Sequence, residues 1–264
     1  PFDEVWYHSD EVRLTTQYSQ LNFKPNTQHV YSNGGYSLLA SIVEQVSGMP
    51  FGEFLKQRIF NPLGMETALV YSHPNLELAN DAIGYRVANG NPVKVSSTTD
   101  YSYGSGNLWA SLSDMIKWGQ NFFSPKVGNA EMLNRITNKY NTLENGDSLF
   151  YTYGLYVRKY KGLKIVDHQG GIPGFRNYFI LFPDDNLIII ASFNNESVNA
   201  RGIVYGIADL LLADKIVEQG TKPRVEVDVN LELAKGFTGT YELTDGMELT
   251  FEIEKDTLWL SLAS

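Results

Sequence analysis

The chain has 264 residues, of which 43% are hydrophobic and 19% are charged. This is an ordinary globular composition with enough apolar residues for a sizeable core, so intrinsic disorder is excluded. The formal net charge is -9, which argues against a nucleic-acid partner because phosphate binding needs concentrated Lys and Arg.

Several other classes of protein are excluded by what the sequence lacks. It contains no cysteine, so it has no disulfide framework, thiolate zinc site or cysteine nucleophile. No apolar run reaches the ~18–20 residues that span a bilayer. His8 and Glu11 have helical spacing but no evident third ligand, so we expect no metal, and no cofactor is implied. The chain starts at Pro1 rather than Met, and we expect a processed form, a domain or a fragment.

Two helices are predicted near the start of the chain. Apolar residues recur at helical spacing from 36 to 46, and Gly48 follows where a left-handed cap is favoured. A second helix is predicted after Pro50, ending before the turn at 61–64. Two amphipathic helices with a short link indicate a helical layer.

The next segment has no sustained periodicity. Residues 71–107 are rich in Asn, Gly, Ser and Tyr, and we expect loops with short strands there. A third helix is predicted to begin near Ser111, which fits a capping box with Asp114.

The pattern then becomes typical of strands. Residues 187–191 are continuously apolar, so we expect that strand to be buried on both faces. A helix over 203–211 is expected to cover one of those faces. The predicted strands cover 151–160, 164–167, 177–182 and 187–193, and a turn at 183–186 joins the last two.

These elements predict an α+β fold (an α/β sandwich), with an antiparallel sheet flanked by helices plus a helical lobe. We assign it to residues 1–220. After a linker at 221–224 and an extended run at 225–229, apolar residues alternate with polar ones at 249–253 and 258–262. We therefore expect a C-terminal β module to begin in 231–264.

Two short motifs stand at the ends of predicted elements. Tyr31-Ser32-Asn33 directly precedes the first helix, and His168-Gln169-Gly170-Gly171 follows a strand. With the stretches 31–68, 103–114 and 168–195, in that order, they resemble the penicillin-recognising serine hydrolases, which include serine β-lactamases, penicillin-binding proteins, D-peptidases and esterases. The resemblance runs from about Phe23 to about Asn195 and implies a β-lactamase/transpeptidase-like fold.

The resemblance also implies roles for five residues. Tyr31 would be the base or proton shuttle, and Asn33 would present its amide to the substrate carbonyl and the catalytic Lys. His168, where other members have Lys, would hydrogen-bond Tyr31 or the substrate. Gly170 would let substrate backbone approach the strand, and the Gly171 N–H would donate to the oxyanion.

Each of these residues also has a structural interpretation. Tyr31 alone fits a half-buried aromatic residue with a solvated hydroxyl, and His168 alone fits a surface hydrogen-bonding residue. Helix capping accounts for Ser32 and Asn33, and turns account for Gly170, Gly171 and Gly174.

The sequence departs from the family pattern at the nucleophile. None of its Lys residues has a Ser or Thr three positions before it, so no Ser-x-x-Lys motif is present, and no Gly-x-Ser-x-Gly replaces it. We therefore expect the fold to be incomplete at the N-terminus and the chain alone to be inactive. We also expect the missing N-terminal segment, or another chain, to cover the exposed sheet and one side of the cleft.

Two functions remain open. The first is a serine acyl hydrolase of D-peptidase, esterase or β-lactamase type that works through an acyl-enzyme on a small-molecule or short peptide substrate. The second is a non-catalytic module of the same fold that binds a peptide or acyl ligand. His168 in place of Lys favours a peptidase or esterase over a penicillinase. The resemblance favours a periplasmic, secreted or membrane-attached location.

Overall fold

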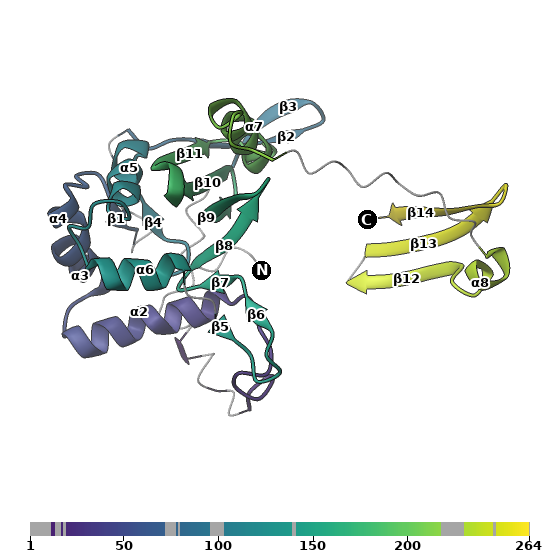
Figure 1. The fold of residues 1–264 in the computed structure, drawn as a ribbon, viewed down its shortest axis with the longest axis horizontal. Helices are drawn as coiled ribbons and strands as arrows, with labels where there is room; N and C mark the ends of the chain where they lie inside the picture. The colour runs from purple at the N-terminus through teal and green to yellow at the C-terminus, as the bar shows by residue number, and fades with distance from the viewer. Residues whose placement is uncertain are drawn as a thin grey trace. The chain divides into compact units, whose positions relative to one another are not determined.

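The structure is a computed structural model that describes residues 12–13, 17, 20–71, 78, 80–95, 103–138, 141–217, 230–244 and 247–263. The chain divides into two compact units, Pro1–Val217 and Glu218–Ser264 (Figure 1). Both units mix helices and strands, so the chain is a mixed α+β protein.

The first unit is built on a five-stranded antiparallel sheet with the strand order β11-β10-β9-β8-β7. The prediction of one strand over 151–160 is wrong, because a tight turn at Tyr153 and Gly154 splits it, and both residues have positive φ. The strands are β7 (Tyr151–Thr152), β8 (Leu155–Tyr160), β9 (Leu163–Ile172), β10 (Phe175–Phe182) and β11 (Leu187–Phe193). The turn between the last two strands contains the short helix η2 (Pro183–Asp185).

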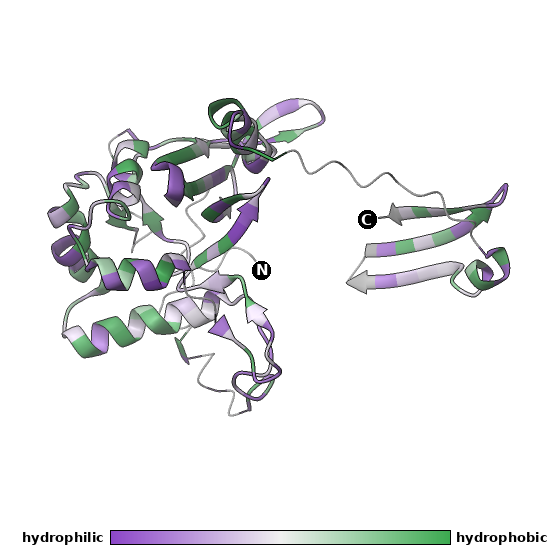
Figure 2. Cartoon of the chain, viewed as in Figure 1, coloured by the Kyte–Doolittle hydropathy of each residue, from purple (hydrophilic) through white to green (hydrophobic). Residues whose placement is uncertain are grey.

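Helices cover both faces of this sheet. Successive residues of a strand point to opposite faces, and Ile180 packs with α7 (Ala200–Leu211) whereas Phe179 packs with α5 (Leu112–Gln120). Figure 2 shows how hydrophobic β10 and β11 are between these helices. Residues 187–191 are packed from both sides as predicted, although β11 is an edge strand of the described sheet and only Ile189 in this stretch is buried.

The helical lobe begins with α2 (Asn33–Ser47), which confirms the first predicted helix. Ser32 caps it by accepting a hydrogen bond from the Gly35 N–H at 3.0 Å, and Gly48 ends it in the left-handed conformation. The second helix runs further than predicted and ends at Gly64. It comprises α3 (Phe51–Leu55), the π-helical turn η1 (Lys56–Phe60) and α4 (Asn61–Leu63).

The third predicted helix, α5, begins after Ser111 as expected. Ser111 accepts the Asp114 N–H, but the Asp114 carboxylate binds the Thr67 N–H and hydroxyl, so only half of the predicted capping box forms. A further helix, α6 (Ala130–Asn138), was not predicted.

Short two-stranded pairings occupy the connections. In 71–107 the structure has the hairpin of β2 (Gly84–Ala88) and β3 (Asn91–Val95), as expected for loops with short strands. The hairpin docks beside the β9–β10 turn and the end of β11, because the Tyr85 N–H donates to the Gly174 carbonyl at 3.3 Å and to the Asn194 carbonyl at 3.0 Å. The other pairs are β1 (Leu69–Val70) with β4 (Leu108–Trp109), and β5 (Asn141–Thr142) with β6 (Ser148–Leu149).

The second unit contains a helix and a three-stranded antiparallel sheet in the order β12-β13-β14. The alternating strands predicted at 249–253 and 258–262 are confirmed. The elements are α8 (Leu231–Lys235), β12 (Gly239–Thr244), β13 (Met247–Glu254) and β14 (Thr257–Ala263). The linker and extended run predicted at 221–229 lie outside the described residues, and the assignment of domains to 1–220 and 231–264 stays a prediction.

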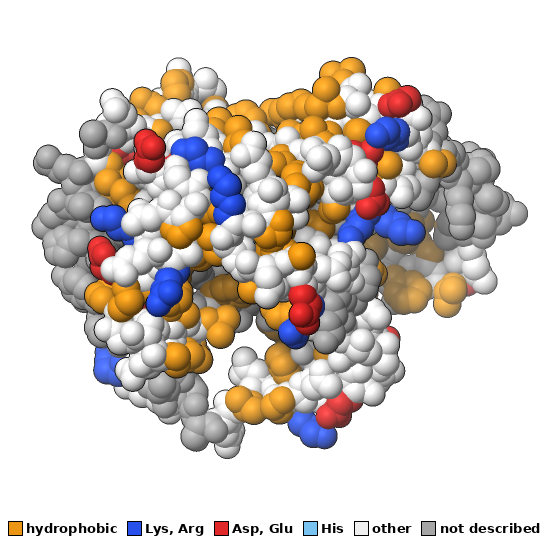
Figure 3. Space-filling view, turned by 60° about the vertical axis from the view of Figure 1, so that its left-hand side comes forward, with side chains coloured by type: hydrophobic (Ala, Val, Ile, Leu, Met, Phe, Trp, Pro, Cys, Tyr) orange, Lys and Arg blue, Asp and Glu red, His pale blue; other side chains and the backbone are white. Residues whose placement is uncertain are grey.

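Large apolar side chains are exposed on two helices of the first unit. On α2, Val46 is 82% exposed, and on α7, Leu210 is 82% exposed. On the face drawn in Figure 3, hydrophobic side chains lie among dispersed charged ones. That another segment or chain covers the exposed sheet and one side of the cleft stays a prediction. Within the described part of the chain, no helix combines the length and apolar character needed to cross a membrane.

Candidate active site

Tyr31 and His168 lie next to each other in the structure. Tyr31 stands two residues before α2, and His168 lies within β9. Their ring centroids are 6.1 Å apart and the ring planes are inclined by 36°. The fold therefore brings together the two motifs on which the sequence-based site prediction depends.

The polar contacts of His168 go to partners that the sequence did not predict. Its Nε2 atom lies 3.2 Å from the hydroxyl oxygen of Tyr151, and its Nδ1 atom lies 2.6 Å from the carbonyl oxygen of Gln169. Both ring nitrogens are thus engaged, and His168 meets Tyr31 through its ring rather than through the expected hydrogen bond.

Tyr151 is the centre of a group of rings that we call the aromatic cluster: His29, Tyr31, Tyr151, Tyr156 and His168. The Tyr151 ring lies 5.7 Å from His29, 5.8 Å from Tyr31 and 4.7 Å from Tyr156, measured between centroids. Tyr156 also stacks on His168 at 5.7 Å and 28°. Edge-to-face and stacked ring pairs at these distances are favourable, so the cluster holds its members in defined orientations.

Sequence reasoning did not identify Tyr151, Tyr156 or His29 as site residues. The available signal was the density of Tyr between 151 and 156, a segment that spans the unrecognised turn at Tyr153-Gly154. That stretch was interpreted as one strand, so the hairpin that brings Tyr151 and Tyr156 together was missed.

The hydroxyl of Tyr151 also interacts with that of Tyr36, which lies in the first turn of α2. Burial and the neighbouring Tyr36 raise the pKa of Tyr151 above its ordinary value. Burial likewise raises the pKa of Tyr36. Both phenols therefore stay protonated near neutral pH and can donate hydrogen bonds.

Asn33 is the first residue of α2, and its side chain is exposed. In the part of the chain that the structure describes, its amide makes no hydrogen bond to another side chain, so it can meet a ligand. Ser32 has the structural role that was its alternative interpretation, since its hydroxyl caps α2.

Gly170 and Gly171 lie in the exposed end of β9, where they pair with Asn177 and Arg176 of β10. A Cβ atom at Gly170 would meet nothing closer than 3.7 Å, so the fold does not require glycine there. The turn interpretation holds for Gly174 instead, which has φ +83 and would bring a Cβ atom to 2.7 Å from the Gly84 Cα atom.

The strand that carries His168 is anchored by its neighbour, Asp167. The Asp167 side chain is fully buried and accepts hydrogen bonds from the Arg158 guanidinium and the Tyr178 hydroxyl. Arg158 in turn lies over the Tyr156 ring at 4.6 Å. A buried charge that is paired and hydrogen-bonded in this way fixes the local geometry of β9 next to the aromatic cluster.

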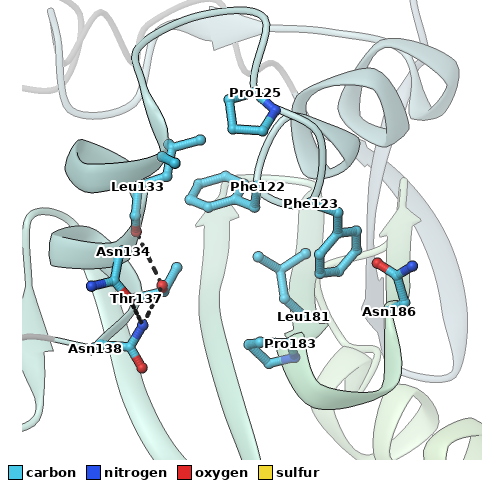
Figure 4. Close-up of a pocket in the computed structure, with 11 residues that line it drawn as sticks. Phe122, Phe123, Pro125, Leu133, Asn134, Thr137, Asn138, Leu181, Pro183 and Asn186 are labelled. Carbon is cyan, nitrogen blue, oxygen red and sulfur yellow. Dashed lines mark hydrogen bonds between the residues drawn. The ribbon is translucent and has the colours of Figure 1, made fainter.

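A cavity of about 380 Å³ lies elsewhere in the first unit, where the end of β10 meets α6 and the turn after α5 (Figure 4). Phe122, Phe123 and Leu181 form apolar parts of its wall, and Asn134 and Asn138 form polar parts. None of the predicted site residues lines it. No three His, Asp or Glu side chains in the described ranges gather as metal ligands would, and His8 and Glu11 lie outside those ranges.

Comparison with known proteins shows the family to which this geometry belongs. The family model described as Beta-lactamase matches residues 3–213. A D-aminopeptidase of Brucella anthropi is 28% identical over 75% of the chain and 37% of its own length. Penicillin-binding protein 4* of Bacillus subtilis is 27% identical over 91% of the chain and 57% of its own length.

Solved structures show the same fold at lower identity. The octameric penicillin-binding protein homologue from Pyrococcus abyssi has a TM-score of 0.70 at 22% identity. The match covers 97% of this chain and 58% of the Pyrococcus abyssi chain. D-amino acid amidase from Ochrobactrum anthropi SV3, complexed with L-phenylalanine, has a TM-score of 0.65 at 22% identity, covering 81% of this chain and 66% of that one.

The chain thus spans 37% to 57% of the length of these two curated relatives. The family match covers most of the chain and includes both the Tyr31 and the His168 motifs. The chain belongs to the Beta-lactamase family of serine hydrolases and penicillin-binding proteins.

Proposed function

We propose that the chain supplies the base and oxyanion side of a serine acyl hydrolase that acts on D-aminoacyl amides or short peptides through an acyl-enzyme. The observation that carries this proposal is the contact between Tyr31 and His168, whose ring centroids are 6.1 Å apart. Tyr31 is 47% exposed, so although its ring belongs to the aromatic cluster, part of the side chain remains open to a ligand.

The chemistry requires three contributions besides the nucleophile. A base must take the proton of the serine hydroxyl, donors must face the developing oxyanion, and the substrate must be held against both. Tyr31 would take the proton, and the Gly171 N–H would donate to the oxyanion. Asn33 would hold the substrate carbonyl, and Gly170 would leave room for the substrate along β9.

Two observations support the proposed substrate class, one from the relatives and one from the site. Among the similar proteins are D-aminopeptidases and a D-amino acid amidase. The residue at 168 is His rather than Lys, which removes a permanent positive charge from the site and disfavours selection of a β-lactam carboxylate. We therefore place amides and peptides ahead of penicillins as substrates.

No Lys in the sequence has a Ser or Thr three residues before it, so we propose that the nucleophile lies outside these residues. Protein sequence beyond these residues would provide the Ser-x-x-Lys motif. If it does not, the same cleft would serve a non-catalytic module that binds peptide or acyl ligands.

Turnover by a completed site tests the proposal. A segment that carries Ser-x-x-Lys, taken from a related D-aminopeptidase, is placed ahead of residue 1, and we call the product the extended protein. It should hydrolyse D-phenylalanine amide faster than L-phenylalanine amide or a penicillin. A folded extended protein that binds D-phenylalanine amide without hydrolysing it would support the binding module instead.

A further inference from the structure

We infer that Tyr151 is a positioning residue that fixes the tautomer of His168, with the proton on Nδ1 and an unprotonated Nε2 that accepts from the Tyr151 hydroxyl. The tautomer follows from contacts within this chain alone. Its consequence for catalysis rests on the proposed function.

The Nδ1 side of the imidazole decides the tautomer. Nδ1 lies 2.6 Å from the carbonyl oxygen of Gln169, and a carbonyl oxygen can only accept a hydrogen bond. Nδ1 must therefore carry the proton in the neutral ring. A neutral imidazole has one N–H, so Nε2 is left as an acceptor.

The Nε2 side needs a donor, and Tyr151 provides one at 3.2 Å. Its phenol remains protonated near neutral pH because burial and Tyr36 both raise its pKa. The two contacts are therefore complementary, since each stabilises the tautomer that the other requires.

The backbone holds Tyr151 in this place. Tyr151 pairs with Tyr156 across the β7–β8 hairpin, and the next residue, Thr152, is fully buried with its hydroxyl bound to the Ile136 carbonyl at 2.7 Å. Tyr153 closes the hairpin at φ 44, a conformation that costs free energy for an aromatic residue and persists only where the surroundings impose it.

The arrangement gives His168 an indirect route to a ligand. Its nitrogens are both engaged, but the Tyr151 oxygen, which also contacts the Tyr36 hydroxyl, has a second lone pair that can accept from a further donor. In the proposed hydrolase, His168 thus acts on the site through the Tyr151 hydroxyl, which it polarises, rather than by donating a proton from Nε2.

The ring nitrogens of His168 can be observed directly by ¹⁵N NMR on the chain labelled in histidine. The spectra are recorded at about pH 8.5, well above the pKa of ~6.5 of an unperturbed histidine. The His168 signal is assigned by its loss in His168→Gln. We expect the Nδ1–H form to dominate in the wild type. In Tyr151→Phe, the ratio of Nδ1–H to Nε2–H should fall about two- to tenfold, as expected for the loss of one hydrogen bond.

Tyr153→Phe is the matched control, because it removes a hydroxyl that contacts Arg135 at 3.2 Å instead of His168. Its tautomer ratio should equal that of the wild type. A wild-type ring protonated on Nε2 would overturn the inference, even if Tyr151→Phe failed to fold. Equal ratios in the two variants would overturn it as well. The experiment needs no nucleophile, so its outcome is independent of whether the extended protein hydrolyses an amide.

Discussion

Tyr31, just before α2, and His168, on β9, lie with their ring centroids 6.1 Å apart, and the Tyr151 ring contacts both of them. The start of α2 and the strand β9 thus bring their two motifs together, although the motifs lie far apart in the sequence. Tyr151 bridges them from a separate hairpin. The site is therefore a product of the tertiary fold and depends on the β7–β8 turn as much as on the two motifs.

Removing the Tyr31 hydroxyl should affect the reaction and leave the fold intact. In the extended protein, Tyr31→Phe should slow acylation by about 10²–10⁴, the range expected when a positioned general base is lost. Unfolding by urea should be nearly unchanged, because the Tyr31 side chain is 47% exposed. Stopped-flow acylation and urea titration measure the two effects. An unchanged acylation rate would remove Tyr31 from the site.

A substitution at Gly170 should affect substrate turnover without affecting the stability of the fold. A Cβ atom fits at this position without a contact under 3.7 Å, so Gly170→Ala should change the free energy of unfolding by no more than about 0.5 kcal/mol. In the extended protein, the methyl group should displace the substrate from β9 and lower kcat/KM by about 10². Wild-type kcat/KM in this variant would show that the substrate does not pass Gly170.

The turn beneath Tyr36 can be tested with a matched pair of glycines. Gly154 and Gly146 have nearly equal φ values of +89 and +88, but only at Gly154 would a Cβ atom meet the Tyr36 hydroxyl, at 2.8 Å. Gly146→Ala should lower the free energy of unfolding by about 1–2 kcal/mol through backbone strain alone. Gly154→Ala should lower the free energy of unfolding further, because the contact with the Tyr36 hydroxyl adds to the backbone strain. Equal losses in urea titrations would contradict the packing of this turn.

Asp114 should determine part of the acid stability. Burial raises its pKa, but hydrogen bonds from the Thr67 hydroxyl and N–H and the charge of Lys117 outweigh burial, so the net pKa is below 3.8. A carboxyl group whose pKa is lowered by folding stabilises the protein at any pH above its pKa in the unfolded state. This contribution is lost as the pH falls through its pKa in the folded state. Asp114→Asn should therefore lose stability at neutral pH and show a shallower loss below about pH 4. Urea titrations across this pH range measure both effects, and parallel curves for the two proteins would contradict the assignment.

Local patterns in the sequence predicted α2 and the hairpin of β10 and β11, because their apolar spacing and turn residues point to the same structure. The Gly48 cap was predictable for the same reason, since glycine is favoured where φ is positive. The predicted end of the second helix was wrong, because after the π-helical turn η1 the helix continues through Pro62 as α4 and ends only at Gly64.

The site was predictable in part. Motif resemblance selected Tyr31 and His168, which the fold brings together. It could not select Tyr151, because the Tyr153-Gly154 turn lacks the Asn or Asp that usually marks such hairpins. The contacts of His168 with Tyr151 and the Gln169 carbonyl depend on strand geometry that no short motif encodes.

Covalent labelling tests whether the nucleophile lies outside this chain, since acylation needs the serine and the proposed site residues would only assist it. The chain and the extended protein are each treated with a fluorophosphonate probe, and adducts are mapped by mass spectrometry. We expect no adduct on the chain and a stoichiometric adduct on the Ser of Ser-x-x-Lys in the extended protein. Stoichiometric labelling of any Ser within the chain itself would contradict this expectation.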